Sequence, residues 1–239
     1  MFQYIKIGKI SECPYCNKKL NKIPKRKSKC IFCNKYIFVR TRPLDKKKVL
    51  IKEVELNIID REWFKYNQEK EYNQLLNDPE FLLSKKELVR EFKKEPSLND
   101  IKWRLYSKKD LEYISNRNWG LYTNNKLNKA RILHTENKFD QALRLYLEVC
   151  YLDINGPNNL NVKFGEDTEI MKQLNVKDFN LNNSLLAIGV IGSLKEVIEK
   201  LNISTEKVGN LFLSLRDVVP IELPLSLKKS WNVLLKELK

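Results

Sequence analysis

The sequence predicts a mainly α-helical protein that begins with a small β-stranded segment, and three observations lead to this prediction. The 239 residues include only 7 glycines and 8 prolines, while leucine, lysine, glutamate and asparagine are abundant. This composition favours helices over a loop-rich sandwich or barrel. Two closely spaced cysteine pairs lie in the first 33 residues, and runs of β-branched and aromatic residues follow them. From Asp60 onward, apolar residues recur at helical spacing.

Positive charge is concentrated at the N-terminus. Residues 1–52 contain 16 Lys or Arg and 2 Asp or Glu, a net charge of +14, whereas the other 187 residues contain 29 and 28. We therefore expect a basic N-terminal domain on an electrically balanced body. The predicted domains are residues 1–58, residues 59–169 with a helical hairpin at 125–153, and residues 170–239, whose helices pack on the same body.

The cysteines have the spacing of a metal site. They follow the pattern C-x2-C, 13 residues, C-x2-C, and the candidate ligands are Cys13, Cys16, Cys30 and Cys33. Two residues between cysteines let one backbone turn place two thiolates on one cation, and two such turns complete a tetrahedron. Asn17 and Asn34 each follow a pair, at a position that often needs a positive φ, which asparagine tolerates.

The predicted cofactor is one structural Zn²⁺ held by four cysteines, because four thiolates leave no open position for catalysis. Rubredoxin-type iron and thioredoxin-like redox chemistry remain alternatives. Disulfides are disfavoured because we expect a cytoplasmic protein. The opening ten residues lack the apolar core of a signal peptide. The longest apolar stretch, Leu185 to Leu194, is too short to span a bilayer, which needs about 20 residues.

Two strands are predicted after the cysteines, at Tyr36–Arg42 and Val49–Leu56, around a Pro-Leu-Asp turn. With Cys-Pro-Tyr-Cys and Cys-Ile-Phe-Cys before them, residues 10–56 resemble the zinc-ribbon family. Zinc ribbons occur in transcription factors, polymerase subunits, ribosomal proteins and protein-docking modules, so the resemblance specifies the fold more than the function. The segment also resembles uncharacterised zinc-ribbon proteins from prophage-like bacterial regions, which implies no known activity.

The lysine-rich loop between the cysteine pairs predicts contact with nucleic acid, since a rigid cationic surface suits a polyphosphate. The candidate residues are Lys19, Lys22, Lys25, Arg26, Lys27, Lys29, Arg40 and Arg42. Interleaved aromatic residues, Tyr15, Phe32, Tyr36 and Phe38, are candidates for stacking on unpaired bases. An acidic protein surface and a merely solvated charged face are the alternatives. No amphipathic helix accompanies the lysines, so a membrane is not expected as a partner.

Helix starts are predicted where an aspartate or serine precedes a helical pattern. They lie at Asp78-Pro79, Ser97, Ser107, Ser193, Ser204 and Ser226. The last three would begin helices that run to about Leu201, Leu215 and Leu238. A long loop is predicted at 154–169, where glycine, proline and asparagine gather.

The clearest helical pattern is the hairpin at 125–153. Phe139, Ala142 and Tyr146 sit where the tetratricopeptide repeat (TPR) carries an aromatic, an alanine and an aromatic residue. Ala130 fits the small position upstream, whereas Lys126 replaces the expected tryptophan. One such unit resembles a TPR hairpin inside a helical domain, not a TPR array, and we expect the body to dock a protein partner.

No catalytic residues are predicted. His134 is the only histidine and is expected at a helix end, and Cys150 falls on an apolar helix face. Glu91-Phe92-Lys93 matches a fragment of some nuclease motifs but lies in a helical pattern. Residues 197–213 fit a helix-turn-helix poorly because the second helix would be apolar.

The predicted function is therefore a non-catalytic zinc protein. Its basic ribbon would contact nucleic acid, or a complex bound to nucleic acid, while its helical body docks a protein. The alternatives are a pure protein–protein adaptor, or a subunit of a phage or mobile-element complex, in which the zinc ribbon is only a structural nucleus.

Overall fold

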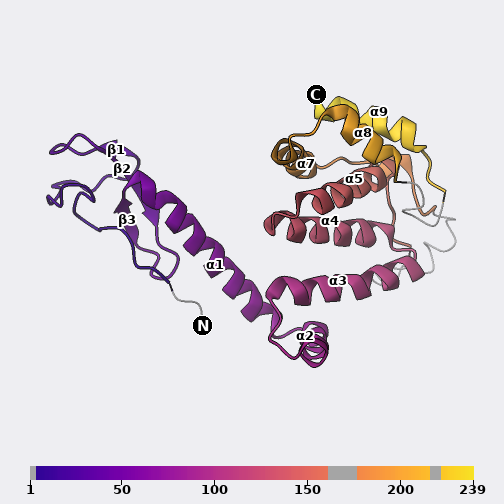
Figure 1. Cartoon of the computed structure of the whole chain (residues 1–239), viewed down its shortest axis with the longest axis horizontal. Coiled ribbons are helices and arrows are strands. Elements are labelled where there is room, and N and C mark those ends of the chain that lie inside the picture. Colours follow the sequence, from indigo (N-terminus) through magenta and orange to yellow (C-terminus); the bar gives the residue numbers. More distant parts are fainter. Residues whose placement is uncertain (1–3, 161–176, 216–221) are drawn as a thin grey trace. The chain divides into compact units, whose positions relative to one another are not determined.

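The structure, a computed structural model, describes residues 4–160, 177–215 and 222–239 (Figure 1). The chain forms two compact units, Met1–Lys86 and Glu87–Lys239. It is mostly helical, with a small three-stranded antiparallel sheet near the N-terminus, which confirms the predicted fold class. The finer division into residues 1–58, 59–169 and 170–239 stays a prediction.

The sheet has the strand order β1-β2-β3. The strands are β1 (Ser28–Lys29), β2 (Tyr36–Thr41) and β3 (Lys48–Ile51). Val39 of β2 lies opposite Leu50 of β3, and Ser28 of β1 lies opposite Ile37. The first predicted strand is confirmed almost to the residue, whereas β1 was not predicted, because two residues give no detectable alternation.

The second predicted strand is too long. Strand β3 ends at Ile51, and the chain turns into a 3-10 helix, η1 (Glu53–Glu55), and then α1 (Leu56–Leu75). The carboxylate of Glu55 accepts the N–H of Lys52 at 2.6 Å, which favours the turn over a longer strand. Val54, predicted in the strand, is 78% exposed.

Helix α1 packs on the sheet within the first unit. Ile59 is buried with Val49 and Ile51 of β3. The indole N–H of Trp63 donates to the carbonyl of Thr41 at 2.7 Å. These contacts extend the small core of the sheet onto the first turns of the helix.

Two predicted helix starts are confirmed at α2 (Pro79–Phe92) and α3 (Leu98–Ser115). The carboxylate of Asp78 accepts the N–H of Glu80 at 2.9 Å, and Ser97 forms a reciprocal capping box with Asp100. The predicted start at Ser107 is wrong. Ser107 lies inside α3, where its hydroxyl donates to the carbonyl four residues earlier.

The second unit is built around α5. Helices α4 (Trp119–Thr135) and α5 (Phe139–Asn155) form the predicted hairpin. The helices that follow are α7 (Ile188–Leu201), α8 (Thr205–Leu213) and α9 (Leu227–Leu238). A short 3-10 helix, η3 (Leu181–Asn183), precedes α7. Helix α5 contacts α4, α7, α8 and α9 and supplies most of the core. Ala130 and Ala142 are fully buried, which allows α4 and α5 to approach closely.

The later helix starts were predicted with mixed success. Ser204 caps α8 by accepting the N–H of Lys207, and α9 begins directly after Ser226, as predicted. Helix α7 begins at Ile188 instead of Ser193, whose hydroxyl donates to the carbonyl of Gly189. Helix α8 ends at Leu213, two residues before the predicted end. Most of the predicted loop at 154–169 lies outside the described residues.

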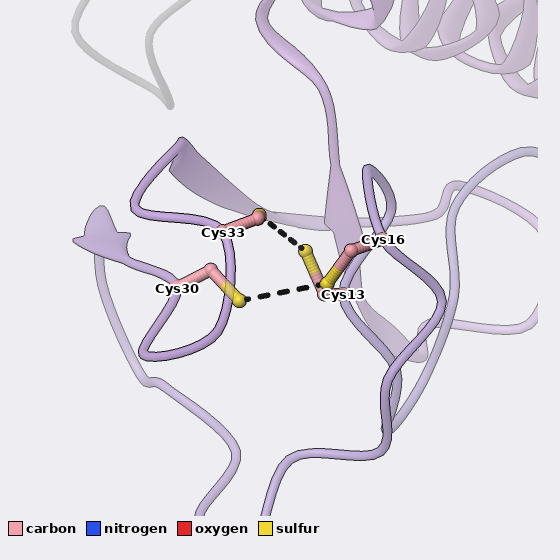
Figure 2. A group of neighbouring side chains, drawn as sticks. All are labelled: Cys13, Cys16, Cys30 and Cys33. Atoms are coloured by element: carbon pink, nitrogen blue, oxygen red, sulfur yellow. Dashed lines mark hydrogen bonds between the residues drawn. The ribbon is translucent and has the colours of Figure 1, made fainter.

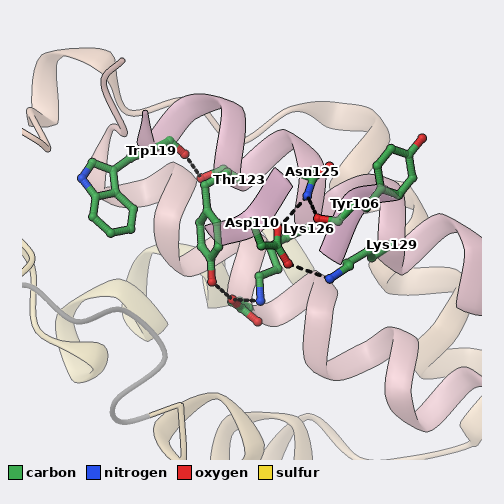
Figure 3. A network of polar contacts seen from close by, with 9 residues as sticks. Tyr106, Asp110, Trp119, Thr123, Asn125, Lys126 and Lys129 are labelled. Atoms are coloured by element: carbon green, nitrogen blue, oxygen red, sulfur yellow. Dashed lines mark hydrogen bonds and ion pairs between the residues drawn. The ribbon is translucent and has the colours of Figure 1, made fainter. Parts of the chain in front are cut away.

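A buried polar network joins α3, α4 and α5 (Figure 3). The two carboxylate oxygens of Asp110 accept from the amide of Asn125 and the ammonium of Lys129, each at 2.6 Å. From the same helix, Lys126 pairs with Glu148 of α5 at 3.2 Å. The network therefore fixes how the three helices pack, with each buried charge matched by an opposite one.

Candidate metal centre

The four cysteine sulfur atoms converge on one point (Figure 2). All lie within 4.8 Å of one another. Cys13 Sγ is 3.7 Å from Cys33 Sγ, and Cys16 Sγ is 3.9 Å from Cys30 Sγ. A tetrahedral ion with Zn–S bonds of about 2.3 Å has sulfur atoms about 3.8 Å apart. The spacing therefore fits four ligands of one ion and is too long for disulfides, whose bond is about 2.05 Å.

Each cysteine pair lies on a turn with the same backbone hydrogen bonds. In the first turn, the N–H of Tyr15 donates to Cys13 Sγ at 3.4 Å, and in the second the N–H of Phe32 donates to Cys30 Sγ at 3.4 Å. Such N–H groups stabilise a thiolate. Asn17 and Asn34 have φ angles of 59° and 56°, which confirms the prediction made for both.

The two turns also share side-chain contacts that sequence reasoning missed. Both follow the pattern Cys-x-aromatic-Cys-Asn-Lys, at residues 13–18 and 30–35. Lys18 Nζ lies 5.1 Å from the centre of the Phe32 ring, and Lys35 Nζ lies 5.2 Å from the centre of the Tyr15 ring. Each lysine thus lies near the aromatic ring of the opposite turn, and the two turns make reciprocal cation–π contacts.

The surroundings shift the pKa values of the Cys13 and Cys30 thiols in opposite directions. Cys13 and Cys30 are buried beside Leu20, Ile37 and Leu50. Burial raises the pKa of the Cys13 thiol to about 12. Burial acts in the same direction on Cys30, but hydrogen bonds from the N–H groups of Phe32 and Cys33 and from the side chains of Cys13 and Cys33 together outweigh it and lower its pKa to about 7. The hydrogen bonds at Cys30 thus favour its thiolate, the form that binds a metal.

The predicted nucleic-acid-binding residues are exposed with one exception. The exposed ones are Lys19, Lys22, Lys25, Arg26, Lys27, Lys29 and Arg40. Arg42 is buried, and its guanidinium donates to Asp45 and to the carbonyl of Ile7. The sequence feature that could have indicated this ion pair is Asp45, three residues after Arg42 in the same turn. We therefore assign Arg42 to the architecture of the unit and leave it out of the proposed interface.

Other residues considered from the sequence have structural surroundings. Cys150 is fully buried in the core of the second unit. His134 Nδ1 lies 3.3 Å from the hydroxyl of Tyr146, and its Nε2 lies 3.6 Å from Glu196. Glu91 pairs with Arg104 of α3. Phe212, on the second helix of the weak helix-turn-helix pattern, is fully buried.

Within residues 4–160, 177–215 and 222–239, the four cysteines form the one group of histidine, cysteine or acidic side chains placed closely enough to hold a metal ion. In the same ranges, every helix is too short or too polar to cross a membrane.

The first unit combines a three-stranded antiparallel sheet with a four-cysteine candidate metal site, and the second unit is helical. The arrangement is consistent with a zinc ribbon. Comparison of the chain with protein-family models, curated proteins and solved structures finds no match. The likenesses to prophage-associated ribbons and to the TPR hairpin therefore remain resemblances.

Proposed function

We propose that residues 10–56 of the first unit form a zinc ribbon, in which Cys13, Cys16, Cys30 and Cys33 hold one Zn²⁺. Sulfur separations of 3.7 and 3.9 Å support the assignment, as does a ligand set made entirely of cysteine. Four thiolates saturate a tetrahedral ion, so the metal would stabilise the fold and take no part in catalysis. The metal would contribute on the order of 10 kcal/mol to the folding of so small a core.

The zinc ribbon would contact nucleic acid through its exposed cations, and one observation carries this proposal. No acidic residue lies between Glu12 and Asp45. Those two acids already pair inside the unit, Glu12 with Lys9 and Asp45 with Arg42. The cations of the lysine-rich loop therefore lack local carboxylates to neutralise them, and a polyphosphate would supply the missing counter-charge.

Charge reversal tests this proposal. The variant Lys25→Glu/Arg26→Glu/Lys27→Glu/Lys29→Glu should lose most of its affinity for nucleic acid. If about five cations meet phosphates, log K on duplex DNA should fall with log salt at a slope near −4.5. The matched control reverses four exposed lysines of the second unit, Lys195, Lys200, Lys207 and Lys228, which changes the net charge equally. Equal behaviour of the two variants would refute a specific role for the loop.

The helical unit would bind a protein, and a pocket supports this second function. The pocket has a volume of about 450 Å³ and lies among α2, α3 and the turn between α4 and α5. Leu88, Phe92, Trp103 and Ile132 line its apolar part. Phe92 and Trp103 are 54% and 36% exposed, so the pocket offers aromatic surface to a partner. Most of α5, by contrast, is buried within the unit and unavailable for docking.

Purification from native cells, with and without nuclease, separates the two functions. A protein partner that survives nuclease and the four-site charge reversal, but is lost on Trp103→Ala, would support docking at the pocket. If the protein proved to be an adaptor only, the charge reversal would leave every interaction unchanged. Loss of all partners on nuclease treatment would instead favour nucleic acid alone.

A further inference from the structure

The two cysteine turns have the same backbone but different surroundings. The hydroxyl of Tyr15, in the first turn, accepts the N–H of Glu53 at 3.2 Å and ties that turn to the start of η1. The corresponding ring of the second turn, Phe32, is 44% exposed, and its neighbour Ile31 is 76% exposed. The first turn is thus held by the rest of the unit, while the second presents an aromatic ring to solvent.

A second exposed ring lies close by in the sequence, on the adjoining strand. Tyr36 begins β2, lies opposite Lys29 of β1, and is 48% exposed. The ammonium groups of Lys27 and Lys29 lie 4.8 and 5.2 Å from the centre of its ring. Phe32 has Lys18 at 5.1 Å in the same way. At least one lysine of the lysine-rich loop between the cysteine pairs therefore lies over each exposed ring.

We infer that Phe32 and Tyr36 form a stacking platform for the unpaired bases of single-stranded nucleic acid. The inference rests on the proposed function and names its substrate class. A base stacks on an aromatic ring while its phosphate needs a cation nearby, and the ring–lysine pairs offer both groups together. Bases inside a duplex are already stacked on their neighbours, so exposed ring faces give no comparable advantage with duplex DNA. On binding, each lysine would move from the ring to the adjacent phosphate.

The first test compares single strands with duplex in a fluorescence anisotropy titration. The full-length, zinc-loaded protein is titrated into labelled oligothymidylate, oligouridylate and a mixed-sequence duplex. The variant Phe32→Leu/Tyr36→Leu keeps the apolar bulk and removes both rings. It should bind single strands at least about fivefold more weakly, since one stacked base contributes a factor of roughly 5 to 150. Its affinity for duplex should change less than twofold.

Two variants serve as controls. Phe32→Tyr/Tyr36→Phe keeps both rings and should bind like the wild type. Phe64→Leu removes a ring that is 50% exposed on α1 of the same unit and should leave all affinities unchanged. Zinc content is measured for every variant. A second experiment uses the wild-type protein, so that it does not depend on how the variants fold: photo-crosslinking to a 5-iodouridine strand should label Phe32 or Tyr36.

The outcomes separate this inference from the proposed function. If the leucine variant binds single strands normally, and crosslinks fall elsewhere, stacking is refuted while charge-dependent binding can still stand. Equal loss of single-strand and duplex affinity would also overturn it. Wild-type protein that binds neither single strands nor duplex would overturn both proposals. The wild type could instead bind no nucleic acid but keep a purified protein partner that Phe32→Leu no longer binds. That result would overturn the inference and assign the exposed turn to protein docking.

Discussion

Cys13 Sγ and Cys33 Sγ lie 3.7 Å apart, although 20 positions separate the two residues in the sequence. This distance is close to the edge of a tetrahedron of sulfur ligands around one zinc ion. Cys13 and Cys30 are also part of the buried core of the first unit. The candidate metal site and the core of the sheet are therefore one structure.

Removal of the metal is expected to unfold the sheet, because the metal would supply much of its folding free energy. The amide of Leu50, which donates to the carbonyl of Lys9 at 2.7 Å, should lose protection from hydrogen exchange when a strong chelator is added. The amide of Leu147, in the core of the second unit, should keep its protection. Chelated protein with an unchanged Leu50 amide would contradict the prediction.

Asn34 tests the backbone of the second cysteine turn. Its φ of 56° is in the left-handed region, which glycine adopts freely and β-branched residues adopt only with strain. Asn34→Gly should leave zinc affinity nearly unchanged, whereas Asn34→Val should cost about 1–2 kcal/mol, or roughly a tenfold loss of affinity. Competition with a chromophoric chelator measures both. Equal affinities for the two variants would show that the turn does not need this φ.

The buried pair of Asp110 and Lys129 should contribute to stability mainly through its balance of charge. Lys129→Met leaves the carboxylate without its cation, and the free energy of unfolding should fall by about 3–5 kcal/mol. The double variant Asp110→Asn/Lys129→Met removes both charges and should recover part of that loss. Urea unfolding of the wild type, of the single variants Asp110→Asn and Lys129→Met, and of the double variant checks this. A double variant that equals the sum of both single losses would mean that the charges are not coupled.

Asp153 on α5 is expected to make the second unit less stable at higher pH. Burial raises the pKa of its carboxyl group to about 7 in the folded protein, whereas the ordinary value is 3.8. The folded state therefore favours the protonated form, and the stabilisation is complete below about pH 4 and lost as pH rises through 7.

Comparison with Asp153→Asn isolates this effect. Between pH 5 and pH 8 the wild type should lose about 2–3 kcal/mol more unfolding free energy than the variant, which cannot ionise at this position. Urea titrations at both pH values give the difference. Parallel pH profiles for the two proteins would show that Asp153 does not titrate in this range.

Local chemistry made part of the fold predictable from sequence. The cysteine spacing, the asparagines at positive φ and the cap at Ser97 each depend on residues within a few positions. Reliance on neighbouring residues alone also explains why helix starts were wrongly predicted at Ser107 and Ser193. A serine followed three residues later by an acid resembles a helix start, but inside a helix its hydroxyl can bond to the preceding turn.

The features that could not be predicted from the sequence depend on tertiary contacts. Sequence alone could not show that Arg42 is buried while Arg40 is exposed. Arg42 follows the last residue of β2, so its side chain no longer obeys the alternation of the strand, and the exact end of a strand is not readable from the sequence. The reciprocal contacts of Lys18 with Phe32 and of Lys35 with Tyr15 depend on how the two cysteine turns meet. The one sequence feature that could have indicated these contacts is the Cys-x-aromatic-Cys-Asn-Lys pattern, which occurs in both turns.

Elemental analysis combined with native mass spectrometry of freshly purified protein tests the central claim most directly. The wild type and Cys150→Ala, which changes the cysteine outside the site, should each carry one zinc ion per chain. Cys30→Ser should carry none or bind it far more weakly. Wild-type protein free of metal, or a Cys30→Ser variant that keeps a full equivalent of zinc, would contradict the account.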